Sequence, residues 1–266
     1  MKVGFIGCGN MASAMLGGII QKDVVAKEDL MASARTEKTR KKIKEEFQIA
    51  AIEDNKELAA KSDIIVLAIK PVYMEEVIEE IAECVTEEKI IVTLAPGKTL
   101  EWLDVTFGKP TKLIRTMPNT PALVGEGMTA LCPNELVSDR EMQVVEEIFQ
   151  SFGKTQVVSE PMIDVVVGVS GSSPAYVFLF IEAMADAAVA DGMMRAQAYE
   201  FAAQAVLGSA KMVLETGMHP GALKDMVCSP GGTTIEAVRV LEEKGMRSSV
   251  SVSYTHLRAH ETRSNL

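Results

Sequence analysis

Residues 4–12 read GFIGCGNMA, and this stretch decides the fold. A short apolar run enters a glycine-rich turn, and a helical pattern follows at residues 11–20. The spacing is G-x-G-x-x-A at Gly7, Gly9 and Ala12, in which the glycines allow a tight turn and close approach of a pyrophosphate. In a strand–loop–helix context this predicts a dinucleotide-binding loop. The competing interpretation is a tight turn that binds no ligand.

Segments on the C-terminal side of this loop alternate between two patterns. Runs rich in Val and Ile recur at residues 2–7, 29–34, 63–69, 89–95 and 112–117. Amphipathic stretches lie between them, at residues 37–47, 55–61 and 74–85. This alternation predicts an α/β fold, a Rossmann-type doubly wound parallel sheet. A later helix is expected from its N-cap at Ser138 to Gly153, followed by a last strand at 154–159.

The pattern changes at Glu160, where Ala, Met and Leu begin to recur at helical spacing and continue to residue 247. We therefore expect a dinucleotide-binding domain at 1–159 and an all-α domain at 160–247. The Ser/Thr-rich tail, 248–266, lacks that spacing, and we interpret it as atypical, foreign or disordered. His256 and His260 lie four residues apart within it, but no third ligand is near in sequence, so no metal site is expected.

Composition narrows the class of protein. The 266 residues are 47% hydrophobic and 24% charged, as in soluble globular proteins, and the net charge of −10 disfavours nucleic acid and anionic membranes as partners. Four scattered cysteines indicate a reducing, cytoplasmic setting. The longest apolar region, 165–194, is interrupted by SGSSP and three acidic residues, which favours a buried or inter-subunit helix over a membrane span.

The end of the second predicted strand indicates which dinucleotide binds. NAD sites usually place an acid there, whereas residues 32–38 read ASARTEK, with Ser33 and Arg35 before the first acid. A hydroxyl and a guanidinium suit a 2′-phosphate, so NADPH is preferred and NAD stays possible. Lys38 belongs equally well to a solvated basic helix face. Lys70, directly after a buried strand, is interpreted as a ribose or phosphate contact.

A second glycine turn, SPGGTT at residues 229–234, precedes another helical pattern. Free backbone N–H groups, the helix dipole and two threonine hydroxyls suit a small carboxylate. No Ser-His-Asp or Cys-His combination is recognisable in this half of the chain.

Five segments together resemble the Δ1-pyrroline-5-carboxylate reductase family: FIGCGNMA, AIKP, RTMPNTPALVGEG, GSSPAY and LKDMVCSPGGTTIEAVRVLE, at residues 5–12, 68–71, 115–127, 171–176 and 223–242. The resemblance covers residues 1 to about 247. It implies an NAD(P)-binding domain followed by a helical domain that forms homodimers or larger homo-oligomers. It also implies reduction of an imino-acid substrate, pyrroline-5-carboxylate, to L-proline, the last step of proline biosynthesis.

Residue roles follow from the resemblance in the same way. The cofactor-binding positions it implies are Gly7, Gly9, Asn10 and Met11, then Ser33, Arg35 and Asn55 at the adenosine end, and Ala68, Lys70, Pro71, Ala95 and Gly97 toward the nicotinamide. Substrate-binding positions are Gly231, Gly232 and Thr233 for the carboxylate, with Glu160 near the substrate and Asn119 shaping the nicotinamide pocket. The catalytic pair is Thr234, beside the ring nitrogen, and Ser229, which braces the turn.

Two alternatives remain open. A β-hydroxyacid dehydrogenase would use a lysine on a Gly-rich helix, which Gly208 and Lys211 offer, but SPGGTT would then have no role. An inactive cofactor-binding fragment is the other, because relatives continue an apolar helix where this chain has its tail. Ser173, where the family more often has Gly, and Met226, where some relatives have an amide, also depart from the pattern.

Overall fold

The structure, a computed structural model, describes residues 1–252. Backbone contacts divide the chain into two compact units, and the division falls between Gly171 and Ser172. The expected boundary, after residue 159, lies earlier, so the first helical residues beyond Glu160 pack with the sheet-containing unit.

An eight-stranded sheet forms the centre of the first unit, with strand order β3-β2-β1-β4-β5-β6-β7-β8. The strands are β1 Val3–Ile6, β2 Leu30–Ser33, β3 Ala50–Ile52, β4 Ile64–Leu67, β5 Ile90–Thr93, β6 Lys112–Met117, β7 Gly127–Pro133 and β8 Gly153–Val157. The order 3-2-1-4-5-6 is that of a Rossmann fold and confirms the predicted fold class. One part of the expectation needs correction: β7 runs antiparallel to β6, because the hairpin-like segment between them is too short for a helical crossover.

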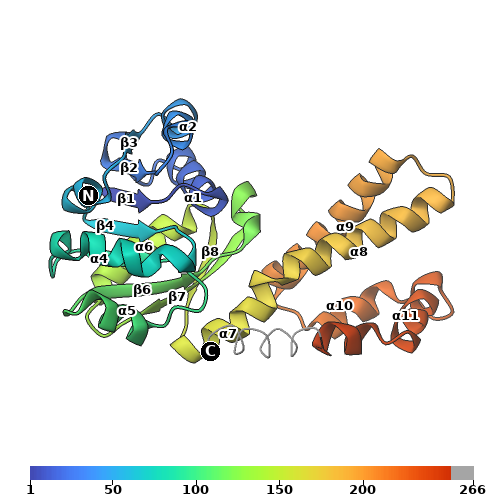
Figure 1. The fold of residues 1–266 in the computed structure, drawn as a ribbon. Helices are drawn as coiled ribbons and strands as arrows, with labels where there is room; N and C mark the ends of the chain where they lie inside the picture. The colour runs from blue at the N-terminus through green and yellow to red at the C-terminus, as the bar shows by residue number, and fades with distance from the viewer. Residues whose placement is uncertain (253–266) are drawn as a thin grey trace. The chain divides into compact units, whose positions relative to one another are not determined.

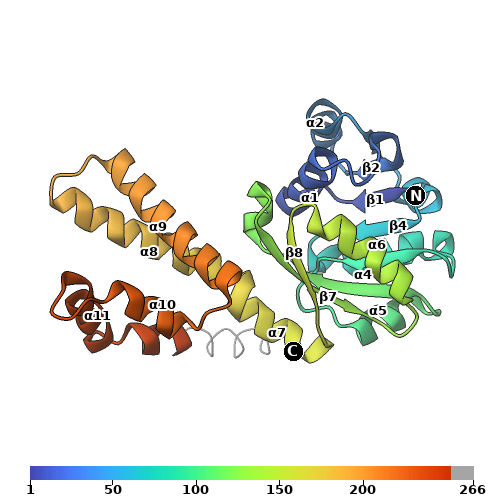
Figure 2. The ribbon, with the colours of Figure 1, turned by 180° about the vertical axis from the view of Figure 1, so that it is seen from behind.

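Helices cover both faces of the sheet (Figures 1 and 2). The helices of this unit are α1 Asn10–Gln21, α2 Glu37–Phe47, α3 Asn55–Lys61, α4 Met74–Ile81, α5 Leu100–Phe107 and α6 Asp139–Gln150. Apolar side chains of α1, α2 and α6 form one core with one face of the sheet, and those of α3, α4 and α5 form a second core with the other. Burial on both faces explains why the central strands are continuous apolar runs.

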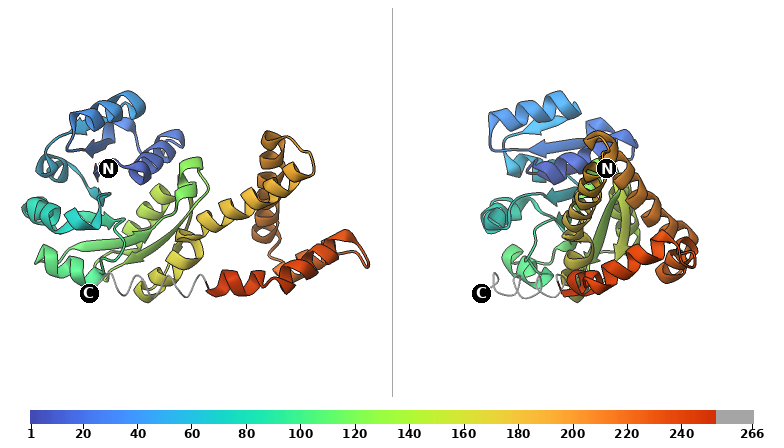
Figure 3. Two further views of the ribbon diagram at one scale, coloured as in Figure 1. Left: turned by 45° about the vertical axis from the view of Figure 1, so that its right-hand side comes forward. Right: turned by 90° about the vertical axis from the view of Figure 1, so that its right-hand side faces the viewer.

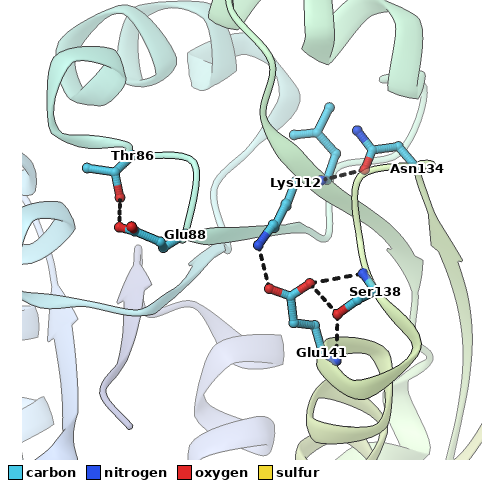
Figure 4. A network of polar contacts seen from close by, with 7 residues as sticks. Thr86, Glu88, Lys112, Asn134, Ser138 and Glu141 are labelled. Carbon is cyan, nitrogen blue, oxygen red and sulfur yellow. Dashed lines mark hydrogen bonds and ion pairs between the residues drawn. The ribbon is translucent and has the colours of Figure 1, made fainter.

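Polar contacts fix the start of α6, as the sequence predicts (Figure 4). Ser138 and Glu141 form a reciprocal capping box, and Lys112 of β6 pairs with the Glu141 carboxylate. Burial raises the pKa of Glu141, but hydrogen bonds from Lys112 and Ser138 outweigh it and lower that pKa to about 2. Beside this network, Asn134 accepts a hydrogen bond from the Leu113 amide and holds the β6–β7 edge.

A continuous run of helical turns follows strand β8 in the chain. It comprises a 3₁₀ turn at Glu160–Met162, α7 at Ile163–Val166 and a π-helical turn at Val167–Gly171. Further 3₁₀ turns occur at Lys27–Asp29, Pro71–Tyr73, Ala82–Cys84 and Thr120–Val124. The π turn ends where the first compact unit ends, and π turns are frequent at functional sites.

The second unit is entirely helical over its described residues, as predicted. Its elements are α8 Ser173–Ala190, α9 Arg195–Thr216, α10 Pro220–Val227 and α11 Thr233–Glu243. The antiparallel pair α8 and α9 pack against each other (Figure 3). Residues 246–252 are also helical, so the tail expected to be irregular from residue 248 begins as helix. Residues 253–266, with His256 and His260, lie outside the described residues.

Candidate active site

The glycine loop joins β1 to α1 in a conformation that requires glycine at its first position. Gly7 has φ of +89°, and a Cβ there would lie 2.7 Å from the Ala68 carbonyl oxygen. Its amide donates to the Ser33 carbonyl, which ties the loop to the end of β2. A Cβ at Gly9, in contrast, would meet no atom within 4 Å, so the backbone there faces open space. This leaves room for a group to approach the loop.

The N-terminus of α1 is suited to an anion. Gly9 is the N-cap, and no side chain among residues 1–252 caps the helix. The first N–H groups of this twelve-residue helix, from Asn10 and Met11 onward, therefore point toward the loop with the positive end of the helix dipole. Ala12 is buried, which brings α1 close to the sheet as the small residue predicts.

Two further loops lie at the same edge of the sheet, because β1, β4 and β5 are adjacent and parallel. Ala68 follows β4, and Lys70 is exposed directly before Pro71, which starts a 3₁₀ turn. Ala95 follows β5, is buried, and donates its amide hydrogen to Thr93 Oγ1 at 3.2 Å. Gly97 in the same loop has φ of +73°. The fold thus brings the three predicted cofactor loops to one edge.

Two of the residues expected at the adenosine end, Ser33 and Asn55, contact each other in the first unit. The Ser33 hydroxyl donates to Asn55 Oδ1 at 2.7 Å, and Asn55 Nδ2 donates to a Glu80 carboxylate oxygen at 2.8 Å. Ser33 is fully buried, so this chain of hydrogen bonds fixes the orientation of the Asn55 amide. The participation of Glu80 was not predicted, because it comes from α4 and carries no local sequence signal.

Arg35 has two partners that sequence reasoning missed. Its guanidinium carbon lies 4.4 Å from the centre of the Tyr73 ring, and its Nη2 lies 3.2 Å from a Glu76 carboxylate oxygen. Both Arg35 and Glu76 are largely exposed. The stacked, planar guanidinium therefore stands beside the end of β2 with its donors open to a second ligand.

Asn119 and Glu160 make contacts that organise the first unit. Asn119 Oδ1 accepts from the Met128 amide at 2.8 Å, and Asn119 Nδ2 donates to the Ser170 carbonyl in the π turn at 2.9 Å. Glu160 Oε1 accepts from the Leu100 amide at 2.7 Å and from Arg115 Nη1 at 3.0 Å. Arg115 is buried, so the Glu160 carboxylate compensates a buried charge. It also satisfies the first amide of α5, whose N-cap residue is Thr99.

The second glycine turn belongs to the helical unit and repeats the features of the first. Gly231 has φ of +69°, and the Gly232 amide donates to the Ser229 carbonyl at 3.0 Å. Helix α11 begins at Thr233 with Gly232 as N-cap, and no described side chain caps it. Thr233 and Thr234 are exposed. Free N–H groups and two hydroxyls thus surround an open helix N-terminus.

In the part of the chain that the structure describes, the cysteines, the possible metal ligands and Lys211 show no sign of a catalytic role. Burial raises the pKa of the Cys8 thiol, opposed by its hydrogen bond with Ser13, and burial raises the pKa of Cys132, so neither is an activated nucleophile. Within residues 1–252, no cluster of His, Cys, Asp or Glu could hold a metal ion. Lys211 on α9 is exposed and pairs with Glu215 one turn away, as a surface lysine does.

Comparisons with known proteins agree along nearly the whole chain. The model for pyrroline-5-carboxylate reductase dimerisation matches residues 160–262, and the model for NADP oxidoreductase, coenzyme F420-dependent, matches residues 2–97. The chain is 56% identical to the pyrroline-5-carboxylate reductase of Escherichia coli K12, over 96% of this chain and 94% of that protein. It is 42% identical to that of Methanosarcina acetivorans, over 93% and 92%.

Solved structures extend the agreement to three dimensions. The Plasmodium falciparum pyrroline carboxylate reductase, crystallised with NADP bound, is 31% identical and superposes with a TM-score of 0.90, covering 100% of this chain and 98% of that one. The Coxiella burnetii pyrroline-5-carboxylate reductase is 33% identical with a TM-score of 0.92, covering 98% and 97%. The glycine loop, the open α11 turn and these relatives lead to one conclusion: the chain belongs to the pyrroline-5-carboxylate reductase family.

Proposed function

We propose that this protein reduces Δ1-pyrroline-5-carboxylate to L-proline with NADPH as the preferred cofactor and NADH as a possible one. One observation carries the proposal: each compact unit presents an uncapped helix N-terminus after a left-handed glycine, at α1 and at α11. A dinucleotide pyrophosphate and a substrate carboxylate are both anions that such termini bind. Proline biosynthesis follows from the reaction.

The cofactor positions divide by the part of the dinucleotide they would hold. Gly7, Gly9, Asn10 and Met11 would hold the pyrophosphate on the α1 N-terminus. At the adenosine end, Arg35 would bind the 2′-phosphate, and Ser33 and Asn55 would face the ribose. The loops containing Ala68, Lys70, Pro71, Ala95 and Gly97 would line the path of the nicotinamide, and Asn119 would shape its pocket. When bound, NADPH supplies the hydride.

The substrate positions lie on the α11 turn. The carboxylate would rest on the turn at Gly231, Gly232 and Thr233, with the Gly231 and Thr233 amides as donors. The Gly232 amide donates to the Ser229 carbonyl, through which Ser229 would brace the turn, and the Thr234 hydroxyl would orient the ring nitrogen. A cyclic imine is readily protonated at its nitrogen. The imine carbon can then accept hydride, and the C=N double bond becomes a C–N single bond. The chain therefore needs to orient and desolvate the imine, and no strong acid is required.

Homo-oligomerisation through the helical unit is part of the proposal. Phe178, Leu179, Phe201, Leu207 and Leu214 on α8 and α9 are each more than half exposed in the single chain. Apolar exposure of this extent indicates an association surface. The helical stretch Glu160–Ala190 could cross a membrane by length and composition, since an 18-residue window within it has a mean hydropathy of 1.5. A second copy of the chain would cover the same apolar residues. The family model that matches residues 160–262 is that of pyrroline-5-carboxylate reductase dimerisation, which supports this arrangement.

Location and the remaining site roles are proposed on the same basis. All four cysteines are free, which supports a reducing, cytoplasmic compartment. A place near the substrate is also proposed for Glu160, but the contacts of this residue support that role least. Both Arg115 and the Leu100 amide donate to the same Glu160 carboxylate oxygen.

The reductase proposal is tested by following NADPH oxidation with pyrroline-5-carboxylate. Thr234→Ala should lower kcat/KM by about 10- to 100-fold, the effect of losing a hydrogen bond to a charged group. Thr234→Ser restores the hydroxyl and should recover most of the activity, and Ser209→Ala on exposed α9 is the matched control. A folded wild type that oxidises no NADPH, or a Thr234→Ala variant as active as Ser209→Ala, would contradict the proposal.

A further inference from the structure

Acidic side chains reach the end of β2 from an unexpected element. The strand itself supplies no acid, and the first one after it is Glu37, in the first turn of α2. Glu76 and Glu80 of α4 approach instead, and they lie four residues apart on one face of that helix. Glu80 is occupied with Asn55, whereas Glu76 pairs with Arg35.

The Arg35–Glu76 pair is held in a way that permits exchange of partners. Arg35 and Glu76 side chains are 61% and 70% exposed, so their attraction is weak and either group can leave the other. The stack on Tyr73 keeps the guanidinium at the end of β2 without using its hydrogen-bond donors. Arg35 is thus positioned by an aromatic ring and neutralised by a removable carboxylate.

We propose that Glu76 is a specificity-determining residue that competes with the 2′-phosphate of NADPH for Arg35. This inference deepens the proposed function and rests on it. A 2′-phosphate brings about −1.5 to −2 charges to the guanidinium, and it would compete there with the Glu76 carboxylate for the same positive charge. NADH brings no charge to that position and leaves the Arg35–Glu76 pair intact. Glu76 therefore reduces the preference for NADPH that Arg35 confers, and keeps NADH usable.

The test measures direct binding of each reduced nucleotide by its fluorescence, without substrate. Glu76→Gln should tighten NADPH binding by about two- to fivefold, the size of an exposed ion pair, and leave the NADH Kd unchanged. Glu75→Gln is the matched control: it removes the same charge from the same first turn of α4, and Glu75 makes no ion pair within residues 1–252. In an Arg35→Met background Glu76→Gln should no longer tighten NADPH binding, because the guanidinium for which Glu76 and the 2′-phosphate compete is absent.

The outcomes separate this inference from the reductase proposal. A wild type that binds neither nucleotide refutes both. A wild type that binds NADPH, with Glu76→Gln no different from Glu75→Gln, refutes the role of Glu76 alone. Equal tightening of NADPH and NADH, or a gain that persists in full without Arg35, also overturns it, since the effect would then come from general charge.

Discussion

Replacing Glu160 by alanine separates two roles that this carboxylate can have. The family resemblance places it near the substrate, whereas the structure joins its Oε1 to the buried Arg115 guanidinium and to the first amide of α5. If the contacts within the first unit are its main role, Glu160→Ala should weaken the fold and leave substrate affinity unchanged. A substrate role predicts the reverse.

The size of the loss follows from burial. The side chain of Arg115 is 7% exposed and that of Glu160 28%, so the pair is neither fully buried nor fully solvated. Removing one partner of a fully buried pair costs about 3–5 kcal/mol, and the lost backbone hydrogen bond adds about 1 kcal/mol. Water that reaches Arg115 through the vacated space offsets part of this, and we expect about 2–3 kcal/mol. In a domain of this size that lowers the thermal midpoint by about 4–12 °C.

The assay pairs a thermal melt with steady-state kinetics. Glu101→Ala is the control, because it removes an exposed acid from the first turn of the same helix α5. Glu160→Gln should fall between wild type and Glu160→Ala, since it keeps an acceptor for the Leu100 amide but leaves Arg115 without a counter-charge. A Glu160→Ala melt equal to that of Glu101→Ala, with KM for pyrroline-5-carboxylate raised about tenfold, would refute the structural reasoning.

Two further predictions test local features. Gly7→Ala should weaken NADPH binding by more than about tenfold, because residue 7 has a positive φ and the new Cβ would collide with the Ala68 carbonyl oxygen. Gly17→Ala in α1 is the control, since no atom lies within 4 Å of its Cβ position. It should bind NADPH as the wild type does and melt at a slightly higher temperature. Glu141→Gln should cost about 1–3 kcal/mol at pH 7. The pKa of Glu141 is lowered to about 2 in the fold, so its contribution is complete above about pH 4.5 and declines toward pH 2. Urea unfolding of both proteins between pH 7 and pH 3 should show their difference shrinking, and a constant difference would contradict the assigned pKa.

Local patterns predict the first unit well where each strand and helix carries its own signal. The range 37–47 is α2 as expected, and the Ser138 cap is present with its capping box. Strand β7 was missed, because GMTALCP begins with Gly, ends with Pro and alternates weakly. The π turn at Val167–Gly171 was also missed, since its sequence reads as continuous helix and only its packing distinguishes it.

Side-chain partnerships are the part of the site that no local pattern could give. Arg35 was predicted from its place after β2, but its contacts with Tyr73 and Glu76 were not. The contact of Asn55 with Glu80 was also not predicted. These contacts exist because α4 and the turn before it pack beside α3 on the sheet. Asn119 and Glu160 show the same limit. Their identities point to the site, whereas their hydrogen bonds, to the π turn and to Arg115, depend on tertiary structure.

A chain of net charge −10 that is proposed to bind two anionic ligands must do so with short-range interactions. Its long-range field repels them, but that field is screened within about 10 Å at ordinary ionic strength. The amides at the N-termini of α1 and α11 act at hydrogen-bond distance, where screening is small, and both lie behind glycines that let a ligand approach. Arg35 adds a full positive charge only where a 2′-phosphate would stand, and Glu76 partly cancels it. On these proposals, selectivity between the two dinucleotides would rest on a balance of a few exposed charges, and recognition of their shared pyrophosphate would rest on the backbone.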